Sequence, residues 1–410
     1  MTHPLWHLSP LSLLLFCAAC QDPSPKPVPR AEPTPQPSVQ NADPTPTLNA
    51  DDPESCRPCH GTIVEEWTQS MHSMAHHDKD PIYGAMRALR MKKQGKELAS
   101  KCASCHNPRA PQDLQSPAAL AGVSCATCHN INGVQKGKHG AAALAWNTNG
   151  TMRGSKTLPP GASPVHGTGP ALPALADGQT LCLACHGQTQ TPSGAAACTT
   201  GPEYNAAQTK ETCVSCHMAQ APGPGGAVHK ATSHASHAFA GPHRAWLQND
   251  PSILQAAVDL KATADPSTSQ LTVTLTNLSA HGFPTGFPGR MAIVVIEFTD
   301  QAGASIWKNI RTNPMTDDPQ AVLNKVYVDK DNNPVPAAFA ARLARDNRLK
   351  PTEARTITAA IPPKAVKAHV RLVYRLLPPK LATKLNLTDR PEATPKTIAS
   401  TTLDLPPAVK

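Results

Sequence analysis

Five copies of the pattern Cys-x-x-Cys-His are the chemically distinctive feature of this 410-residue sequence. They read CRPCH at 56–60, CASCH at 102–106, CATCH at 125–129, CLACH at 182–186 and CVSCH at 213–217. Ten of the 13 cysteines belong to these copies, and the others are Cys17, Cys20 and Cys198. A disulfide framework needs no histidine at a fixed place, and paired Cys-x-x-Cys zinc sites need none directly after the second cysteine. Neither alternative explains the pattern.

The pattern is typical of covalently attached haem c. Two thioether bonds join the cysteines to the vinyl groups of the porphyrin, which places the next residue beneath the iron. An imidazole at that place is a strong axial nitrogen ligand. We therefore expect five covalently bound haem c groups, held by the following residues: Cys56, Cys59, His60, Cys102, Cys105, His106, Cys125, Cys128, His129, Cys182, Cys185, His186, Cys213, Cys216 and His217.

The charge of the chain is compatible with this interpretation. Its formal net charge of +9 would also suit nucleic acid or an anionic membrane surface. Five haems, however, bring about ten propionates, so much of the basic excess can be compensated inside the protein. Aromatic residues make up only 4% of the chain, and no interleaved basic and aromatic pattern occurs. We expect no nucleic acid partner.

Histidines outside the motifs are numerous enough to supply every second axial position. Between residues 51 and 250 they are His72, His76, His77, His139, His166, His229, His234, His237 and His243. Coordination by two histidines gives a low-potential, closed haem suited to passing electrons. Methionine ligands would raise the potential, and the candidates are Met71, Met74, Met152 and Met218, although methionine is more often a packing residue.

The first fifty residues indicate export rather than a folded domain. Residues 1–19 are predicted to be a signal peptide, whose apolar core LSLLLF is too short for a permanent membrane span. The sequence CAAC at 17–20 resembles a bacterial lipoprotein cleavage site, in which Cys20 becomes the lipidated first residue; ordinary cleavage to a soluble periplasmic protein is the alternative. Residues 20–50 are rich in proline and are predicted to be an extended tether.

The rest of the chain divides into two predicted domains. Residues 51–250 carry all five motifs, and we expect short helices and loops packed around five haems, with helices over 65–77 and 81–102. Residues 251–410 lack the motif. Segments such as SQLTVTLTNL at 269–278 alternate apolar and polar residues, and RMAIVVIEFTD at 290–300 predicts a more buried strand. We predict an antiparallel immunoglobulin-like sandwich of about seven strands here.

Residues 55–246 resemble the multihaem cytochromes of the cytochrome c-554 type, which share haem arrangements with hydroxylamine oxidoreductase and pentahaem nitrite reductase. The resemblance rests on CRPCHGTIVEEWTQSMHSMA, on the closely spaced CASCHNP and GVSCATCHN, and on CVSCHM followed by SHAFAGPHRAWL. It implies haems stacked in near contact. It also implies that His72 is the distal ligand of a haem other than its own, followed in preference by His237, His243 and His139. His234 completes the predicted set of five distal ligands.

Two features outside the motifs remain. The segment NLSAHGFPTGFPGR at 277–290 resembles a β module appended to some of these cytochromes. Its His281 could reach a haem or a propionate, but we prefer the simpler interpretation of a loop between two strands. Cys198 has no partner and no following histidine, so we expect a small buried residue.

These observations favour an exported electron carrier over an enzyme. The predicted role is electron tunnelling along closely packed haems between redox partners, which are other cytochromes, in the periplasm or at the outer membrane of a Gram-negative bacterium. A lipid at Cys20 would anchor the protein to the membrane. The alternative is a reductase acting on nitrite, hydroxylamine or another small molecule at a five-coordinate haem. Pentahaem nitrite reductases commonly carry a lysine in the catalytic motif, whereas all five motifs here end in histidine.

Overall fold

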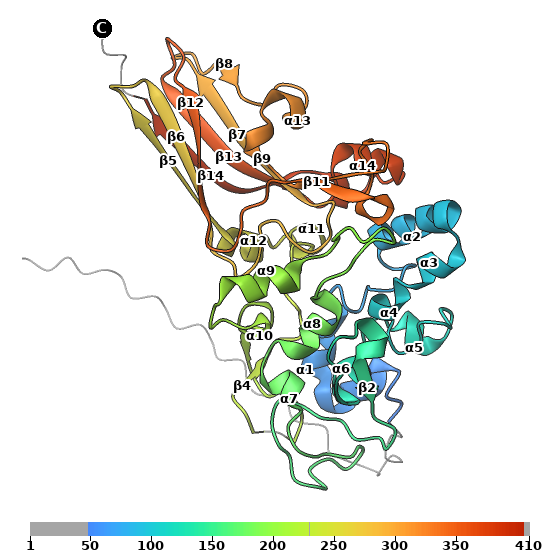
Figure 1. The fold of residues 1–410 in the computed structure, drawn as a ribbon. Coiled ribbons are helices and arrows are strands. Elements are labelled where there is room, and N and C mark those ends of the chain that lie inside the picture. The colour runs from blue at the N-terminus through green and yellow to red at the C-terminus, as the bar shows by residue number, and fades with distance from the viewer. Residues whose placement is uncertain (1–47, 229, 406–410) are drawn as a thin grey trace, which may run out of the picture. The chain divides into compact units, whose positions relative to one another are not determined.

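The chain folds into a helical region that carries the motifs, followed by a region of β-sheets, in the computed structural model (Figure 1). The structure describes residues 48–228 and 230–405. The predicted signal peptide, Cys20 and nearly all of the predicted tether lie outside these residues. None of the helices within them is long and apolar enough to span a membrane.

Each Cys-x-x-Cys-His motif lies on a short helix that is interrupted at the histidine or directly after it. The helices are α1 (Arg57–Thr68), α4 (Ala103–His106), α6 (Cys125–His129), α8 (Thr180–His186) and α10 (Cys213–His217). Residues i, i+3 and i+4 share one face of a helix, so a single turn presents both thiols and the imidazole together. In α1 the break falls on His60 itself, whose φ of −120° and ψ of 37° are not helical.

The predicted helix over 81–102 forms in two parts. Helix α2 (Pro81–Gln94) begins with a proline and is capped by Asp80, whose carboxylate accepts hydrogen bonds from the next two backbone amides. Gly95, at a φ of 87°, ends it before α3 (Lys96–Ser100). The predicted helix over 65–77 was placed too late, because α1 ends at Thr68.

The remaining elements of the helical region are short. The helices are α5 (Pro117–Leu120), α7 (Pro173–Ala176), α9 (Thr200–Ala207), α11 (Arg244–Leu247) and α12 (Ser252–Ala256). Two small antiparallel ribbons pair β1 (Ile131–Val134) with β2 (Leu144–Trp146) and β3 (Gln220–Pro222) with β4 (Ser233–Ala235).

The β region contains two antiparallel sheets and a separate ribbon (Figure 1). One sheet has the order β12 (Ala354–Ala360), β6 (Gln270–Asn277), β5 (Val258–Asp265). The other has the order β14 (Lys396–Asp404), β13 (Lys367–Arg375), β7 (Met291–Thr299), β8 (Ser305–Lys308), with β9 (Val322–Leu323) also on β7. The ribbon pairs β10 (Lys325–Val328) with β11 (Arg342–Asp346), and α13 (Pro314–Asp317) and α14 (Pro379–Lys384) lie in the connections.

The two sheets share one apolar core. Alternate residues Leu271, Val273 and Leu275 of β6 are fully buried, as the period of two predicts. They join a cluster with residues of β7 and β13, so the predicted antiparallel sheets are confirmed; an immunoglobulin-like strand arrangement is not. Ile82 of α2 and Ala245 of α11 belong to the same cluster, so the helical region packs directly on the β region.

Candidate haem-binding site

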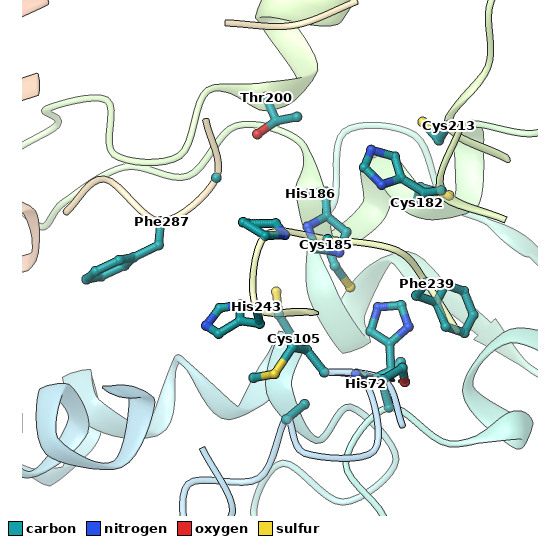
Figure 2. A pocket seen from close by; sticks show the side chains of 18 of the residues that line it. His72, Cys105, Cys182, Cys185, His186, Thr200, Cys213, Phe239, His243 and Phe287 are labelled. Carbon is teal, nitrogen blue, oxygen red and sulfur yellow. Dashed lines mark hydrogen bonds between the residues drawn. The ribbon is translucent and has the colours of Figure 1, made fainter. Parts of the chain in front are cut away.

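All the predicted cofactor-binding cysteines and histidines line a single cavity of about 3320 Å³. Pockets for one drug-sized ligand are roughly 300–1,000 Å³, and five groups in this cavity would each have about 660 Å³. Figure 2 shows part of it, where Cys105 of α4, Cys182 and Cys185 of α8, and Cys213 of α10 lie in the same region as His72 and His186. The space therefore fits several large groups held from different elements.

Four of the five motif histidines are oriented by a backbone carbonyl. The Nδ1 atoms contact these oxygens as follows: His60 to Gly225 at 2.7 Å, His106 to Ala75 at 3.0 Å, His129 to Arg153 at 2.6 Å and His217 to Ala240 at 2.5 Å. A metal-binding histidine usually donates its second ring N–H in this way, which fixes the ring and raises its basicity. In all four rings Nε2 is left for iron.

Three motif histidines face a second imidazole at the distance that a haem between them requires. Two metal–nitrogen bonds of about 2.0 Å, with the offset from each nitrogen to its ring centre, place the centroids roughly 6.3 Å apart. The observed pairs are His72–His186 at 6.2 Å, His129–His237 at 6.1 Å and His217–His281 at 6.2 Å. His72 thus faces the fourth motif and not its own.

Burial keeps these imidazoles neutral, the form that binds a metal. Desolvation lowers the pKa of His72 to about 3 and the pKa of both His186 and His237 to about 4, with smaller contributions from neighbouring imidazoles. Because metal binding requires an unprotonated ring nitrogen, these rings are ready to coordinate throughout the physiological pH range.

Three half-buried arginines supply positive charge inside the same cavity. The Nε atoms of Arg87, Arg153 and Arg290 are buried without a hydrogen-bond partner among the described residues, and all three side chains line the cavity. A buried, unsatisfied donor on a cationic group is costly unless an anion meets it. Haem propionates are such anions, so these residues fit the group that the motifs predict.

Comparison with known proteins agrees with this chemistry. Residues 55–130 match the family model described as cytochrome c554 and c-prime. Over this segment the chain is similar to the cytochrome c554 and c-prime family. It is a multihaem c-type cytochrome.

The similarity to one solved structure covers most of the chain. The penta-heme cytochrome c552 from Thermochromatium tepidum is 25% identical to this chain, with a TM-score of 0.72 over 86% of this chain and 98% of its own. The putative ApaA protein from Bordetella pertussis is 16% identical over 37% of this chain and 91% of its own, with a TM-score of 0.17. No curated protein matches the cytochrome.

Cysteine sulfurs of different motifs lie next to each other in the cytochrome. The thiols of Cys56 and Cys125, of Cys105 and Cys185, and of Cys182 and Cys213 lie near enough to shift each other's pKa, and none of these residues is in a disulfide. Cys128 packs on the cluster that contains Leu181 and Ala184 of the fourth motif's helix. Each sulfur would hold the vinyl edge of its own haem, so neighbouring sulfurs would place the edges of different haems close together.

The other predicted distal histidines are not placed opposite a motif histidine. His243 lines the cavity, and desolvation lowers its pKa to about 3, with Arg290 acting in the same direction. His139 lines the cavity beside Gly187, where an added Cβ would lie 3.2 Å from the imidazole.

His234 uses both ring nitrogens: Nδ1 is 2.9 Å from the carbonyl of Gly223, and Nε2 is 3.1 Å from the Glu66 carboxylate.

Two motif histidines therefore lack a facing imidazole at haem spacing among the described residues, and these are His60 and His106. Instead, the ring of His106 stacks on Tyr83 at 3.7 Å between centroids. His229 lies outside the described residues. Cys198 is half-buried rather than buried, with its Sγ 3.7 Å from Thr200 Oγ1.

The residue that the sequence argument undervalued is His281. We preferred a simple loop at 277–290, whereas the imidazole of His281 lies 6.2 Å from that of His217 with an interplanar angle of 21°. The sequence His-Gly-Phe-Pro-Thr-Gly, which begins at His281, could have drawn attention to this residue. The imidazole that it faces, however, belongs to His217 in the preceding region. Only the fold brings the two together.

Proposed function

We propose that this multihaem cytochrome holds five haems and carries electrons by tunnelling between them, from one redox protein to another. The observation that carries the proposal is that all five motifs line one cavity, with sulfurs of different motifs near enough to shift each other's pKa. Haem edges that approach this closely permit electron transfer without bond chemistry. The penta-heme description of the Thermochromatium tepidum cytochrome supports the same count.

The sulfur contacts support an order of haems. The pairs Cys56–Cys125, Cys105–Cys185 and Cys182–Cys213 link the first motif to the third, the second to the fourth, and the fourth to the fifth. The packing of Cys128 against the fourth motif's helix joins the two groups. The fourth haem is then the junction, and electrons can cross the protein from the first motif to the fifth.

The fifth haem is the best candidate for exchange with a partner. Helix α10 has no buried residue, and Cys216 is exposed. A haem bound there has its vinyl edge near the surface, where another cytochrome can approach it.

Catalysis at an open haem is the second candidate function. It is favoured by His60 and His106, which no described imidazole faces at haem spacing. A five-coordinate ferric haem is high-spin and binds small molecules, whereas haem with two histidine ligands is closed. Low-temperature EPR with and without nitrite, hydroxylamine or peroxide separates the two functions: the electron carrier gives only low-spin signals that these molecules leave unchanged.

Export and anchoring complete the proposal. Covalent haem attachment outside the bacterial cytoplasm, the apolar segment of residues 11–16 and the CAAC sequence support a periplasmic or outer-membrane location with a lipid on Cys20. The proline-rich residues 20–50 would hold the cytochrome away from the membrane surface.

A redox titration tests the main proposal. We expect the α-band of the purified full-length protein to titrate as five one-electron haems, and we expect a partner cytochrome to oxidise all five. A protein that contains five haems but passes electrons from only some of them would contradict the continuous path.

A further inference from the structure

We propose that the β region completes the fifth haem site: His281 is the sixth ligand of the haem attached at Cys213, Cys216 and His217, and Glu203 is the residue that positions it. This inference rests on the proposed haem at the fifth motif. It assigns to the β region a role in coordination that lies outside the segment matched by the family model, residues 55–130.

The orientation of His281 is that of an axial ligand. Its Nδ1 lies 3.1 Å from the carbonyl oxygen of Gly282 and 3.3 Å from the hydroxyl of Ser279, so this ring nitrogen is already engaged. Its Nε2 is left for a metal. His217 has the same arrangement, with Nδ1 held by the Ala240 carbonyl at 2.5 Å. Two imidazoles held through Nδ1, nearly parallel and 6.2 Å apart, are what a haem between them requires.

The loop that carries His281 is fastened to the β region on one side. The side-chain amide of Asn277, at the end of β6, donates to the carbonyl oxygens of His281 at 2.7 Å and Lys350 at 2.9 Å. Phe283 is buried in the shared core, and its backbone pairs with Leu349 in both directions at 2.9 and 3.0 Å. These contacts fix the backbone on both sides of the imidazole.

Glu203, on α9 of the helical region, fastens the same loop from the other side. One carboxylate oxygen accepts from the backbone N–H of Gly282 at 3.0 Å and from the hydroxyl of Thr285 at 2.6 Å. The other oxygen pairs with Arg348 at 2.7 Å, and both side chains of the pair are 11% exposed. A buried ion pair that also accepts hydrogen bonds gives a fixed geometry. Because Gly282 directly follows His281, displacing Glu203 releases the imidazole.

Glycine at position 282 allows a close approach by the ion pair. A Cβ at this position would lie 3.0 Å from Glu203 Oε2 and 3.2 Å from Arg348 Nη1, so a larger residue would displace these side chains by a few tenths of an ångström. Arg348 also donates to the Pro284 carbonyl at 3.2 Å, so both members of the ion pair form hydrogen bonds with the loop that carries His281.

The experiment compares the full-length holoprotein with His281→Ala, His281→Met and Glu203→Ala. For His281→Ala we expect an unchanged haem content by intact mass, one haem equivalent converted from low-spin to high-spin by EPR, and recovery of the low-spin signal on addition of imidazole. For His281→Met we expect the fifth haem to stay low-spin with a higher reduction potential, since a methionine ligand raises it.

The positioning role of Glu203 is tested with a measurement that a general loss of stability would not change. For Glu203→Ala we expect a high-spin fraction that is smaller than in His281→Ala and is removed by imidazole, with the potentials of the other haems unchanged. The matched controls are His369→Ala, a histidine on β13 that contacts Thr402, and Glu65→Gln, an exposed residue of α1; both should retain the wild-type spectrum.

The outcomes separate this inference from the proposed function. Five haems by mass with an unchanged low-spin spectrum in His281→Ala would overturn the ligand assignment and leave the electron carrier intact. A wild-type protein that lacks a haem at the fifth motif would overturn both.

Discussion

His72 lies opposite His186, with their ring centroids 6.2 Å apart, so a residue just after the first motif's helix completes the site of the fourth motif. Phe239 packs edge-on against His72 at 4.2 Å and restricts the ring from one side. The fourth site therefore depends on three separate segments of the chain. A change in any one of them should be seen at that haem before it is seen elsewhere.

We expect His72→Ala to convert the fourth haem, and no other, to the high-spin state. The imidazole is half-buried and faces His186, so its removal takes away the second nitrogen ligand expected at that haem. Low-temperature EPR and the appearance of one carbon monoxide-binding ferrous haem are the measurements. His166→Ala is the control, because that ring is bonded to the adjacent Gly167 carbonyl; equal spectra for both variants would contradict the assignment.

Intact mass should report the number of attached haems directly. We expect the mature chain plus five haem groups, and the double variant Cys213→Ala, Cys216→Ala should lose one haem because both thioether bonds of the fifth motif are removed. A wild-type mass with four haems would exclude one motif. Cys198→Ala serves as the control and should keep all five, since Cys198 is outside the motifs.

The ion pair between Glu203 and Arg348 predicts a pH dependence of stability. Burial alone would raise the pKa of Glu203, but the charge of Arg348 and hydrogen bonds from two threonines outweigh it and lower the pKa to about 2. The folded-state pKa is below the unfolded value, so the stabilisation is complete above about pH 4.5 and is lost as the pH falls toward 2. Its size is about 3 kcal/mol.

Denaturant unfolding of the wild-type protein and Glu203→Gln between pH 7 and pH 3 measures this contribution. The difference in the apparent free energy of unfolding should be largest at pH 7 and should shrink below about pH 4.5, because glutamine has no proton to gain. A difference that is constant over this range would mean that the ion pair adds nothing to stability.

Membrane attachment is tested at Cys20. If the thiol is lipidated, Cys20→Ala should move the protein from the membrane fraction to the soluble fraction while its absorbance spectrum stays the same. Cys17→Ala should leave the protein on the membrane and is the matched control. Membrane association that survives the Cys20 change would contradict the anchor.

Local patterns predicted much of this molecule. The haem-binding residues are read directly from the five motifs, because a single helical turn fixes their relation. Strand β6 was recognised from its alternation and β7 from its continuous apolar run. Strand β5 was missed because its inward positions include Ala262 and Ala264, which give little contrast with their polar neighbours. The ribbon of β10 and β11 was missed because charged residues such as Lys325 and Arg345 lie within it.

The pairing of ligands could not be read from the sequence. His72, His237 and His281 face motif histidines that are distant in the chain, and nothing local distinguishes them from His234, whose ring is used by Gly223 and Glu66. Only the packing of α9 against the loop after β6 brings His281 to His217. Long-range contacts decide which imidazole becomes a ligand.

The unequal distribution of buried apolar side chains has a consequence for biogenesis. Most of the main apolar core belongs to the β region, whereas the separate cluster of the helical region is small and consists of Ile131 with three leucines and three alanines. We expect a cell starved of porphyrin to accumulate a chain whose carboxyl half is ordered and whose amino half is open to proteases. Supply of the prosthetic group would then set how much protein survives.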